Sequence, residues 1–425
     1  MAKEPANTNA RKRANSKGDI LAALDIGTSK ICCFIARNSE EQGTRVIGIG
    51  HHISQGVRSG NIVDVEAAQH AINATLDNAE EVAGEKISHV IVNFSGGKLA
   101  SHHADIHINL NGREANDYDI ERALALGQQE NLEEGSELIH LVPTDFSIDG
   151  QHGIRDPRGM IGDNLNAKLH MVSAHYAPIR TLLSALQRCH LNVDHVVVSP
   201  FASGLACLVE DEMELGATVI DMGGGTTTLA LFNDKQMVHA DSIAIGGMHV
   251  TNDIARGLTT PVNHAERLKT LFGNALSSSS DEREMIDVPQ VGEEAPEHAN
   301  HIPKSHLIRI IGPRLEETFE HLRDRMKLAE GSVNIGRRVV LTGGACQLPG
   351  VRELASRILD KQVRIGRPYR LQGLSDNASG PAFATIAGLL AYATNPEAGL
   401  PRFGQDLSAG QGFFGRIAGW LRNAI

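Results

Sequence analysis

Two segments about 200 residues apart share one unusual design, and this duplication constrains the fold more than any other feature of the sequence. In the first, Ile20 to Ala36, a run rich in β-forming residues ends in Asp-Ile-Gly, and a second such run follows at once. In the second, Ala217 to Phe232, the same arrangement surrounds Asp-Met-Gly-Gly-Gly. Each pattern predicts a β-hairpin with a tip of glycine and threonine. The repeat therefore predicts two related lobes that face one ligand.

The residues of the two tips suit a nucleotide. A glycine after the aspartate lets the backbone approach a phosphate closely, and the following N–H groups can point at its oxygens. An aspartate in each hairpin would hold Mg²⁺ through water, because Mg²⁺ prefers few carboxylates and many waters. A single Asp-x-Gly is more often an ordinary hairpin turn, so only the pair favours the phosphate interpretation. The predicted residues are Asp25, Gly27, Thr28, Ser29 and Lys30 in the first hairpin and Asp221, Gly223, Gly224, Gly225 and Thr226 in the second.

Two further glycine pairs follow strand-like runs and precede helical patterns. Gly246 and Gly247 lie between Ser242 to Ile245 and a helical run, and Gly343 and Gly344 come before an expected helix at Val351 to Leu359. We expect both pairs to border the same cleft. Two helices rich in small residues are expected where the lobes cross closely. They are Phe201 to Val209 and Ala382 to Tyr392.

The rest of the pattern gives a domain order. We expect a small α/β insert, in which strand-like runs alternate with one helix, and a polar surface loop at 277–298. The first lobe is built from three separate stretches of chain, and the second lobe contains a small subdomain. The predicted units are a basic tail at 1–18, a first lobe at 19–98 with 177–202 and 379–395, an insert at 99–176, a second lobe at 203–378 with its subdomain at about 251–326, a flexible linker at 396–411 and an amphipathic helix at 412–425.

Composition argues against nucleic acid as a partner. The formal charge is −11, from 40 basic and 51 acidic residues, whereas a phosphate-backbone binder needs a basic surface. One tryptophan and 4% aromatic residues also argue against a platform for stacking bases. The five cysteines show no Cys-x-x-Cys spacing, which is typical of a reducing compartment.

The C-terminal residues form an amphipathic pattern. On a helix, large apolar side chains share one broad face and two arginines lie on the other, as in helices that lie on a membrane surface. Thirteen residues span only about 20 Å, too short to cross a bilayer. The alternative is a helix that docks on its own domain. The predicted membrane residues are Phe413, Phe414, Arg416, Ile417, Trp420, Leu421 and Arg422.

The ordered motifs resemble those of the actin-like ATPase superfamily. LDIGTSK and VIDMGGGTT match its two phosphate signatures, VLTGGACQLPG matches the adenosine signature, and the helices around Ala202 and Ala387 match the connecting ones. The insert, IAIGGMHVTNDIARGL, AERLK, VRIGRP and the amphipathic end narrow the resemblance to the FtsA family of bacterial cell-division proteins. The expected fold is therefore α/β, an actin-like (ribonuclease H-like) two-lobed fold with an inserted subdomain.

This resemblance implies a function. The family binds ATP and Mg²⁺, polymerises like actin, holds the tubulin-like protein FtsZ at the cytoplasmic face of the cell membrane and recruits later division proteins. It places Glu266 and Lys269 of AERLK beside the ribose and base, although an ordinary i, i+3 surface pair is the alternative. It places the FtsZ tail peptide on the small subdomain, where we expect a basic helix, Ile302 to Glu317, with Lys304, Arg309 and Arg314.

The sequence leaves catalysis open. Hydrolysis needs a side chain that orients a water molecule, and none is identifiable in the first connecting helix, so we expect slow ATP turnover at most. The rival interpretations are a soluble ATPase or kinase of the actin fold and a pilus-assembly relative of that fold.

Overall fold

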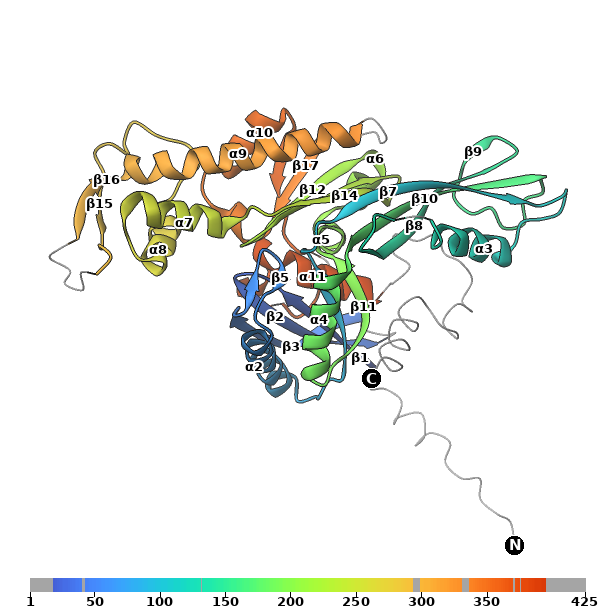
Figure 1. The fold of residues 1–425 in the computed structure, drawn as a ribbon, viewed down its shortest axis with the longest axis horizontal. Coiled ribbons are helices and arrows are strands. Elements are labelled where there is room, and N and C mark those ends of the chain that lie inside the picture. Colours follow the sequence, from blue (N-terminus) through green and yellow to red (C-terminus); the bar gives the residue numbers. More distant parts are fainter. Residues whose placement is uncertain are drawn as a thin grey trace, which may run out of the picture.

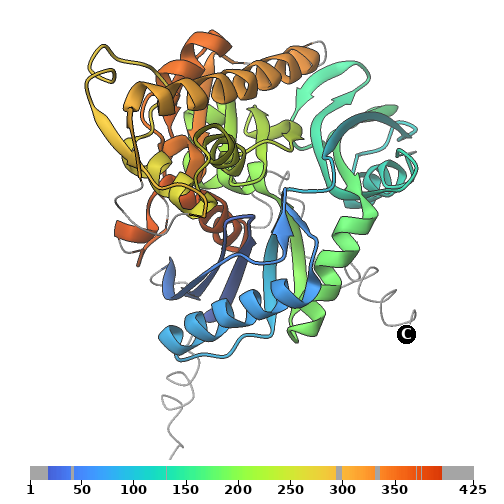
Figure 2. The same cartoon turned by 60° about the vertical axis from the view of Figure 1, so that its left-hand side comes forward.

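A computed structural model describes residues 18–394 except 40–42, 131, 293–298, 331–335, 370 and 375. Two lobes lie one above the other, with the first lobe at the bottom of Figure 1 and the second at the top, and the insert projects to the right. Figure 2 shows the same stacking from another side. Residues 395–425, which include the expected linker and amphipathic helix, lie outside the described residues.

The first lobe is built on a five-stranded sheet of order β11-β6-β1-β2-β3. The first three strands form an antiparallel meander, and β6 and β11 run parallel to β1. Helix α2 packs against β2 and β3, and it begins where the Asp64 side chain accepts hydrogen bonds from two backbone N–H groups. The elements are β1 (Asp19–Ile26), β2 (Lys30–Ser39), β3 (Gly43–Ile53), β4 (Val57–Arg58), β5 (Asn61–Ile62), α2 (Val65–Ala83), β6 (His89–Phe94), α4 (Tyr176–Arg188) and β11 (Asn192–Val198).

The second lobe repeats this sheet. Its order is β14-β13-β12-β17-β18, again an antiparallel meander of three strands followed by two strands parallel to the first. The register is also the same, since Asp25 pairs with Cys32 and Asp221 with Thr228. The predicted duplication is therefore confirmed at the level of whole sheets. The elements are α6 (Glu210–Leu215), β12 (Ala217–Met222), β13 (Thr227–Asn233), β14 (Gln236–Ile243), β17 (Arg338–Thr342), η2 (Gly344–Gln347), α10 (Val351–Leu359) and β18 (Gln362–Ile365).

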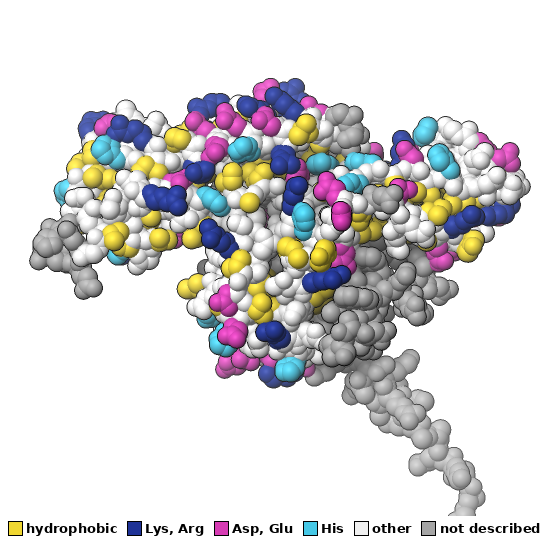
Figure 3. Space-filling view, in the orientation of Figure 1, with side chains coloured by type: hydrophobic (Ala, Val, Ile, Leu, Met, Phe, Trp, Pro, Cys, Tyr) yellow, Lys and Arg dark blue, Asp and Glu magenta, His cyan; other side chains and the backbone are white. Residues whose placement is uncertain are grey.

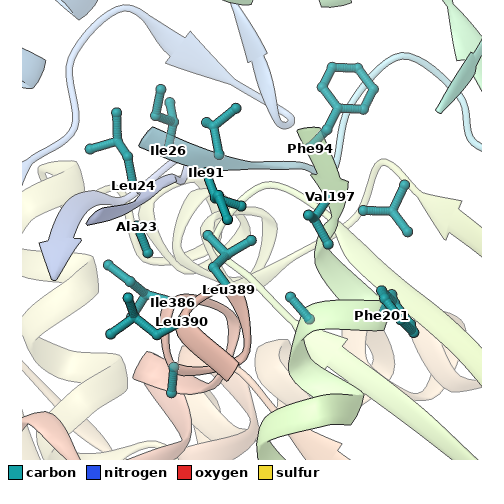
Figure 4. Close-up of a cluster of buried hydrophobic side chains, with 14 of the residues drawn as sticks. Ala23, Leu24, Ile26, Ile91, Phe94, Val197, Phe201, Ile386, Leu389 and Leu390 are labelled. Carbon is teal, nitrogen blue, oxygen red and sulfur yellow. The ribbon is translucent and has the colours of Figure 1, made fainter. Parts of the chain in front are cut away.

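Two helices lie between the sheets, α5 (Ser199–Cys207) and α11 (Ala384–Thr394), preceded by the short turns η3 (Asp376–Ala378) and η4 (Pro381–Phe383). They cross very closely, because a Cβ at Gly388 would lie 1.7 Å from the Ala202 carbonyl oxygen. Figure 4 shows Leu389 and Leu390 of α11 packed among side chains of β1 and β6. The small residues read from the sequence therefore lie at the crossing between the lobes.

The insert forms a separate sheet of order β7-β10-β8-β9 with one helix and its own apolar core. Three strands and the helix fall where the alternating pattern predicted them. The elements are β7 (Ala100–Asn109), α3 (Asp117–Gly127), β8 (Ser136–Ile148), β9 (Gln151–Ile154) and β10 (Asn164–His175).

The small subdomain corrects one expectation. Its elements are α7 (Gly247–Leu258), α8 (Val262–Phe272), β15 (Met285–Val288), β16 (Asn300–Pro303) and α9 (Lys304–Glu330). The segment read as a surface loop contains β15, which pairs with β16 and buries Ile286 and Val288. The prediction was wrong there because only two apolar residues alternate among many acids. Helix α9 also continues beyond the expected Glu317, and its internal proline, Pro313, faces solvent.

Candidate functional site

The two hairpins have the same turn. The Gly27 N–H donates to the Lys30 carbonyl at 3.0 Å, and the Gly223 N–H donates to the Thr226 carbonyl at 2.9 Å. A Cβ at Gly27 would lie 2.9 Å from the Lys30 carbonyl oxygen, and one at Gly223 would lie 3.0 Å from the Thr226 carbonyl oxygen. A larger residue at either position would therefore crowd the turn. The geometry of the turn thus favours glycine at the third position of each Asp-x-Gly.

Each tip keeps free backbone donors. Among the described residues, the N–H groups of Thr28, Ser29, Gly224 and Gly225 have no hydrogen-bond acceptor. All four residues line one cleft. Successive unpaired N–H groups in a turn form a concave anion site, so the two tips together suit a chain of phosphates.

The two tips touch each other. A Cβ at Gly224 would lie 2.0 Å from Ser29 Oγ, and one at Gly225 would lie 2.4 Å from Thr28 Oγ1. The carbonyls of the second tip are also held, because the Gly247 N–H donates to the Gly223 carbonyl at 2.9 Å. The second hairpin is thus fixed between the first hairpin and the start of α7.

The cleft has a volume of about 480 Å³, and fifteen of the sixteen predicted nucleotide residues line it. The exception is Gly246. It supports the cleft from behind, since a Cβ there would lie 2.6 Å from the Gly223 carbonyl oxygen. The lining residues that the sequence predicted are Asp25, Gly27, Thr28, Ser29, Lys30, Asp221, Gly223, Gly224, Gly225, Thr226, Gly247, Glu266, Lys269, Gly343 and Gly344.

The two aspartates differ in their surroundings. Asp221 Oδ2 accepts hydrogen bonds from the hydroxyls of Ser203 at 2.6 Å and Thr385 at 2.7 Å. Burial raises the pKa of Asp221, and these two hydrogen bonds lower it. Burial raises the pKa of Asp25 to about 7, where the Lys30 charge lowers it and the Asp221 charge raises it. A divalent cation between the two carboxylates would favour the ionised form of both.

Lys30 is held at the cleft by an aromatic ring. Its Nζ lies 3.3 Å from the centroid of the Phe383 ring, and that ring stacks on Phe34. A cation over a ring is stabilised by the ring quadrupole without the geometric demands of an ion pair. The ammonium group therefore lines the cleft, and among the described residues no carboxylate oxygen forms an ion pair with it.

Glu266 and Lys269 form the i, i+3 pair that the sequence allowed and also line the cleft. Lys269 Nζ lies 2.6 Å from Glu266 Oε2, and it donates to Thr251 Oγ1 at 2.8 Å and to the Gly247 carbonyl at 3.2 Å. The Lys269 side chain is 16% exposed and the Glu266 side chain 47%. The lysine thus ties α8 to the start of α7, while the carboxylate faces the mouth of the cleft.

Sequence reasoning missed several lining residues. Asn93 is the penultimate residue of β6, and Thr342 is the last residue of β17, so the duplicated topology contained a signal for Asn93. Its amide donates to Ser199 at 3.1 Å and its oxygen accepts from the Ile26 N–H at 2.7 Å. The apolar part of the lining carried no local signal, because the missed apolar residues come from two helices, α7 and α9, and from the loop before α10. The missed residues include Asn93, Ser199, Thr385, Gln347, Val250, Leu315, Leu348 and Pro349.

The three cations predicted to meet a partner peptide lie on or at the start of α9. Lys304 donates to Glu284 at 2.8 Å, and Arg314 donates to Asp253 at 2.5 Å. Arg309 is exposed and has no ion pair among the described residues. Two of the three charges are therefore already neutralised by neighbours.

The predicted membrane residues, 413–425, lie outside the described residues. Within the described part of the chain, no helix is both long and apolar enough to cross a bilayer.

The duplicated sheets and shared cleft define a protein of the actin-like class. Solved structures agree: a PilM–PilN type IV pilus biogenesis complex covers 88% of this chain and 98% of its own at TM-score 0.63 and 16% identity. MreB5 of Spiroplasma citri bound to AMPPNP covers 90% and 99% at TM-score 0.53 and 14% identity. These likenesses establish the fold.

The sequence relatives establish the family. "Cell division protein FtsA" of Rhizobium meliloti is 41% identical over 97% of this chain and 96% of its own length, and that of Escherichia coli is 32% identical over 88% and 90%. The family described as "Cell division protein FtsA" matches residues 218–388, and the "SHS2 domain inserted in FTSA" matches residues 96–173. The chain belongs to the FtsA family of cell-division proteins.

Proposed function

We propose that this FtsA-family protein binds ATP and Mg²⁺ between its lobes, polymerises, and anchors FtsZ filaments at the inner face of the cytoplasmic membrane. The observation that carries the proposal is the pair of equivalent hairpins whose free N–H groups and buried aspartates line one cleft. Recruitment of later division proteins is part of the same proposal.

The residues of the cleft fit such a ligand. The hairpin N–H groups and Lys30 would hold the phosphates, and Glu266 would accept hydrogen bonds from the ribose hydroxyls. Leu315, Leu348 and Val250 supply apolar surface for a base. Asp25 and Asp221 would hold Mg²⁺ through water, and the ion would supply charge neutralisation of the phosphates.

Calorimetry tests this site directly. We expect wild-type protein to bind ATP more tightly with Mg²⁺ than with EDTA, and Asp25→Asn and Asp221→Asn each to lose most of that metal-dependent gain. Glu66→Gln, an exposed change at the start of α2, is the matched control and should bind like wild type. ATP binding that is indifferent to both aspartates and to Mg²⁺ would remove the proposed metal role.

The membrane part of the proposal rests on the sequence of residues 413–425. The five apolar side chains among the predicted membrane residues contribute at best about 1.5 to 3 kcal/mol each when buried, and ordering a free segment offsets much of this. One copy would therefore bind weakly and reversibly. A polymer would align many such segments on one surface and raise the overall affinity without new contacts.

Trp420 reports on this step because it is the only tryptophan in the chain. On adding anionic vesicles we expect its emission to shift to the blue and the protein to pellet with the vesicles. A chain that ends at Gly412 should stay in the supernatant. If the full chain neither shifts nor pellets, with or without ATP, the membrane role fails and a soluble actin-fold protein remains.

Of the three parts of the proposed function, binding of the FtsZ tail has the least support from the described residues. Arg309 is the exposed cation of the three on α9, so Arg309→Gln should weaken binding of an FtsZ tail peptide more than Lys304→Gln or Arg314→Gln, whose charges meet Glu284 and Asp253. Fluorescence anisotropy of a labelled peptide measures the difference. Equal losses in all three variants would contradict the assignment to Arg309.

A further inference from the structure

The β4–β5 hairpin of the first lobe contacts the tips of both Asp-x-Gly hairpins. Figure 1 shows β5 at the end of the first lobe that lies nearest the second lobe. The Gly60 N–H donates to Thr28 Oγ1 at 3.1 Å, and a Cβ at Gly225 would lie 2.9 Å from the Ser59 Cα. The tip of the β4–β5 hairpin, Ser59 and Gly60, therefore packs against the phosphate-facing turns of both lobes.

The same hairpin is bonded to the base of the insert. Asn61 Oδ1 accepts a hydrogen bond from the Gly97 N–H at 3.0 Å, and Gly97 lies in the turn between β6 and β7, where the chain enters the insert. The Gly97 carbonyl accepts from the N–H of His175, the last residue of β10, at 2.8 Å. Asn61 is thus linked through Gly97 to both connections of the insert.

The backbone on both sides of this link lies in the left-handed region. Ser59 has φ 47°, and its carbonyl accepts a hydrogen bond from Asn61 Nδ2 at 3.1 Å. Gly97 and Lys98, at the base of the insert, have φ 66° and 57°. Residues other than glycine occupy this region at a cost when surrounding contacts impose it, and such positions are common in switch regions. The side chain of Asn61 supplies contacts of this kind to both segments.

The insert also contacts the second lobe. Ser101 Oγ accepts from the Ala240 N–H of β14 at 2.8 Å and donates to the Ala240 carbonyl at 2.9 Å, and His103 Nε2 lies 3.0 Å from the Val238 carbonyl oxygen. Figure 3 shows basic and acidic side chains interspersed on one face of the second lobe and the insert, so opposed charged patches do not hold them together there. Because the base of the insert belongs to one lobe and β7 contacts the other, a change in the angle between the lobes would turn the insert.

We propose that the β4–β5 hairpin couples occupation of the cleft to the orientation of the insert, with Asn61 as the connecting residue. This inference rests on the proposed nucleotide site. Thr28 lines the cleft, and among the described residues its hydroxyl accepts from Gly60 but has no acceptor for its own proton. That proton is available to a phosphate oxygen.

The contacts give the order of events. A phosphate held between the two tips would fix their separation and, with it, the β4–β5 hairpin that packs against both. Asn61 would pass this constraint to Gly97 and hold both connections of the insert in one arrangement. Without a ligand, the tips are held only by their own contacts, and the insert would occupy a wider range of orientations.

Paired spin labels test this coupling in the full chain. The five native cysteines are buried, so the labels are attached at Asp77→Cys in α2 of the first lobe and Glu121→Cys in α3 of the insert, two exposed positions. Electron paramagnetic resonance records the distances between them without nucleotide and with saturating ATP and Mg²⁺. The labelled chain is diluted with unlabelled protein, so that only distances within one chain are measured. Calorimetry shows separately whether each variant binds ATP, and thermal unfolding whether it is folded.

Three substitutions are compared in the labelled chain. Asn61→Ala removes the connecting side chain, Asn61→Asp retains an oxygen that can accept from the Gly97 N–H, and Asn192→Ala, an exposed change in the first lobe, is the matched control. We expect ATP to narrow the distribution of distances in wild type, in Asn61→Asp and in the control. Asn61→Ala should still bind ATP, because Asn61 does not line the cleft, but should lose most of this narrowing.

The outcomes separate this inference from the nucleotide site itself. If Asn61→Ala narrows as wild type does, or if wild type with bound ATP shows no change, the coupling is overturned while calorimetry leaves the nucleotide site in place. An equal loss in Asn192→Ala would also overturn the assignment to Asn61. If wild type binds no ATP in calorimetry, the nucleotide site and the coupling fall together.

Discussion

The two Asp-x-Gly hairpins have the same backbone structure but differ in the electrostatic surroundings of their aspartates. Both have the same turn, register and buried aspartate, yet Asp221 receives two hydroxyl hydrogen bonds. The pKa of Asp25 is instead raised chiefly by burial, and the Lys30 charge lowers it while the Asp221 charge raises it. The two lobes therefore share the geometry of the hairpin, while the hydroxyls of Ser203 and Thr385 on the crossing helices donate to Asp221 and make the two carboxylates unequal. The comparison teaches that equivalent positions in a duplicated fold need not ionise alike.

The largest expected effect is on the free energy of unfolding, when each aspartate in turn is replaced by asparagine. Asp25, with a folded pKa of about 7, retains a proton that the unfolded chain releases near pH 4, so stability falls as pH rises between these values. Asp25→Asn should therefore raise the free energy of unfolding of ligand-free protein by up to about 4 kcal/mol at pH 8, and by less than half of that at pH 5. Chemical denaturation at both pH values measures this.

Asp221→Asn is the matched variant. Its free energy of unfolding should rise much less than that of Asp25→Asn. The substitution removes two hydrogen bonds to a charged acceptor, each of which contributes about 1.5 to 3 kcal/mol. Equal gains from the two substitutions would show that the hydroxyls do not distinguish the aspartates.

A buried histidine adds a pH dependence of the opposite sign, which must be separated from that of Asp25. Burial lowers the pKa of His140 to about 4, and its Nε2 accepts from the Val198 N–H at 3.0 Å. The unfolded chain takes up this proton near pH 6.5, so stability falls by about 2 kcal/mol between pH 6.5 and 5. His140→Gln should make this acid limb shallower in unfolding curves and leave the alkaline limb of Asp25. Part of the acid limb should remain, because burial also lowers the pKa of His170. An unchanged acid limb would exclude His140 as its source.

The two hairpin tips also differ in what a larger side chain would contact. Gly224→Ala should cost about 1 to 3 kcal/mol, because its Cβ meets Ser29 Oγ, and Ser29→Ala in the same chain should recover part of the loss. Gly27→Ala meets the Lys30 backbone carbonyl instead, so Ser29→Ala should not rescue it. Thermal unfolding of the two glycine variants, each with and without Ser29→Ala, measures the rescue. If Ser29→Ala rescues both glycine variants, or neither, the contact between Gly224 and Ser29 is not the cause of the loss.

The smallest effect is expected at the mouth of the cleft, which has no counterpart in the first lobe. Lys269→Gln should weaken ATP binding by about twofold to fivefold, since a partly exposed charge contributes about 1 kcal/mol or less. Arg267→Gln, on the exposed face of the same helix, removes the same charge and serves as the control. Calorimetry that finds equal losses would assign the effect to net charge rather than to contact.

Several parts of the site followed from local sequence. Asp-x-Gly followed at once by a β-rich run has few solutions other than a tight hairpin, so the turns at Gly27 and Gly223 were predictable. The strand and helix around Gly343 were equally clear, because an apolar run, a glycine pair and an amphipathic helix follow one another. Strand β15 was missed because its stability comes from pairing with β16 and from burial of Ile286 and Val288, which local composition does not reveal.

By itself, the sequence determined the duplicated hairpins, the insert, the crossing helices and the family to which the chain belongs. These depend on short-range patterns: turn glycines, alternation in strands and small residues along a helix. Only the tertiary structure decided that Ser203 and Thr385 reach Asp221 but not Asp25, that Phe383 holds Lys30, and that Leu315 and Leu348 wall the cleft. Each of these contacts joins residues far apart in the chain, and their distances depend on how the lobes pack.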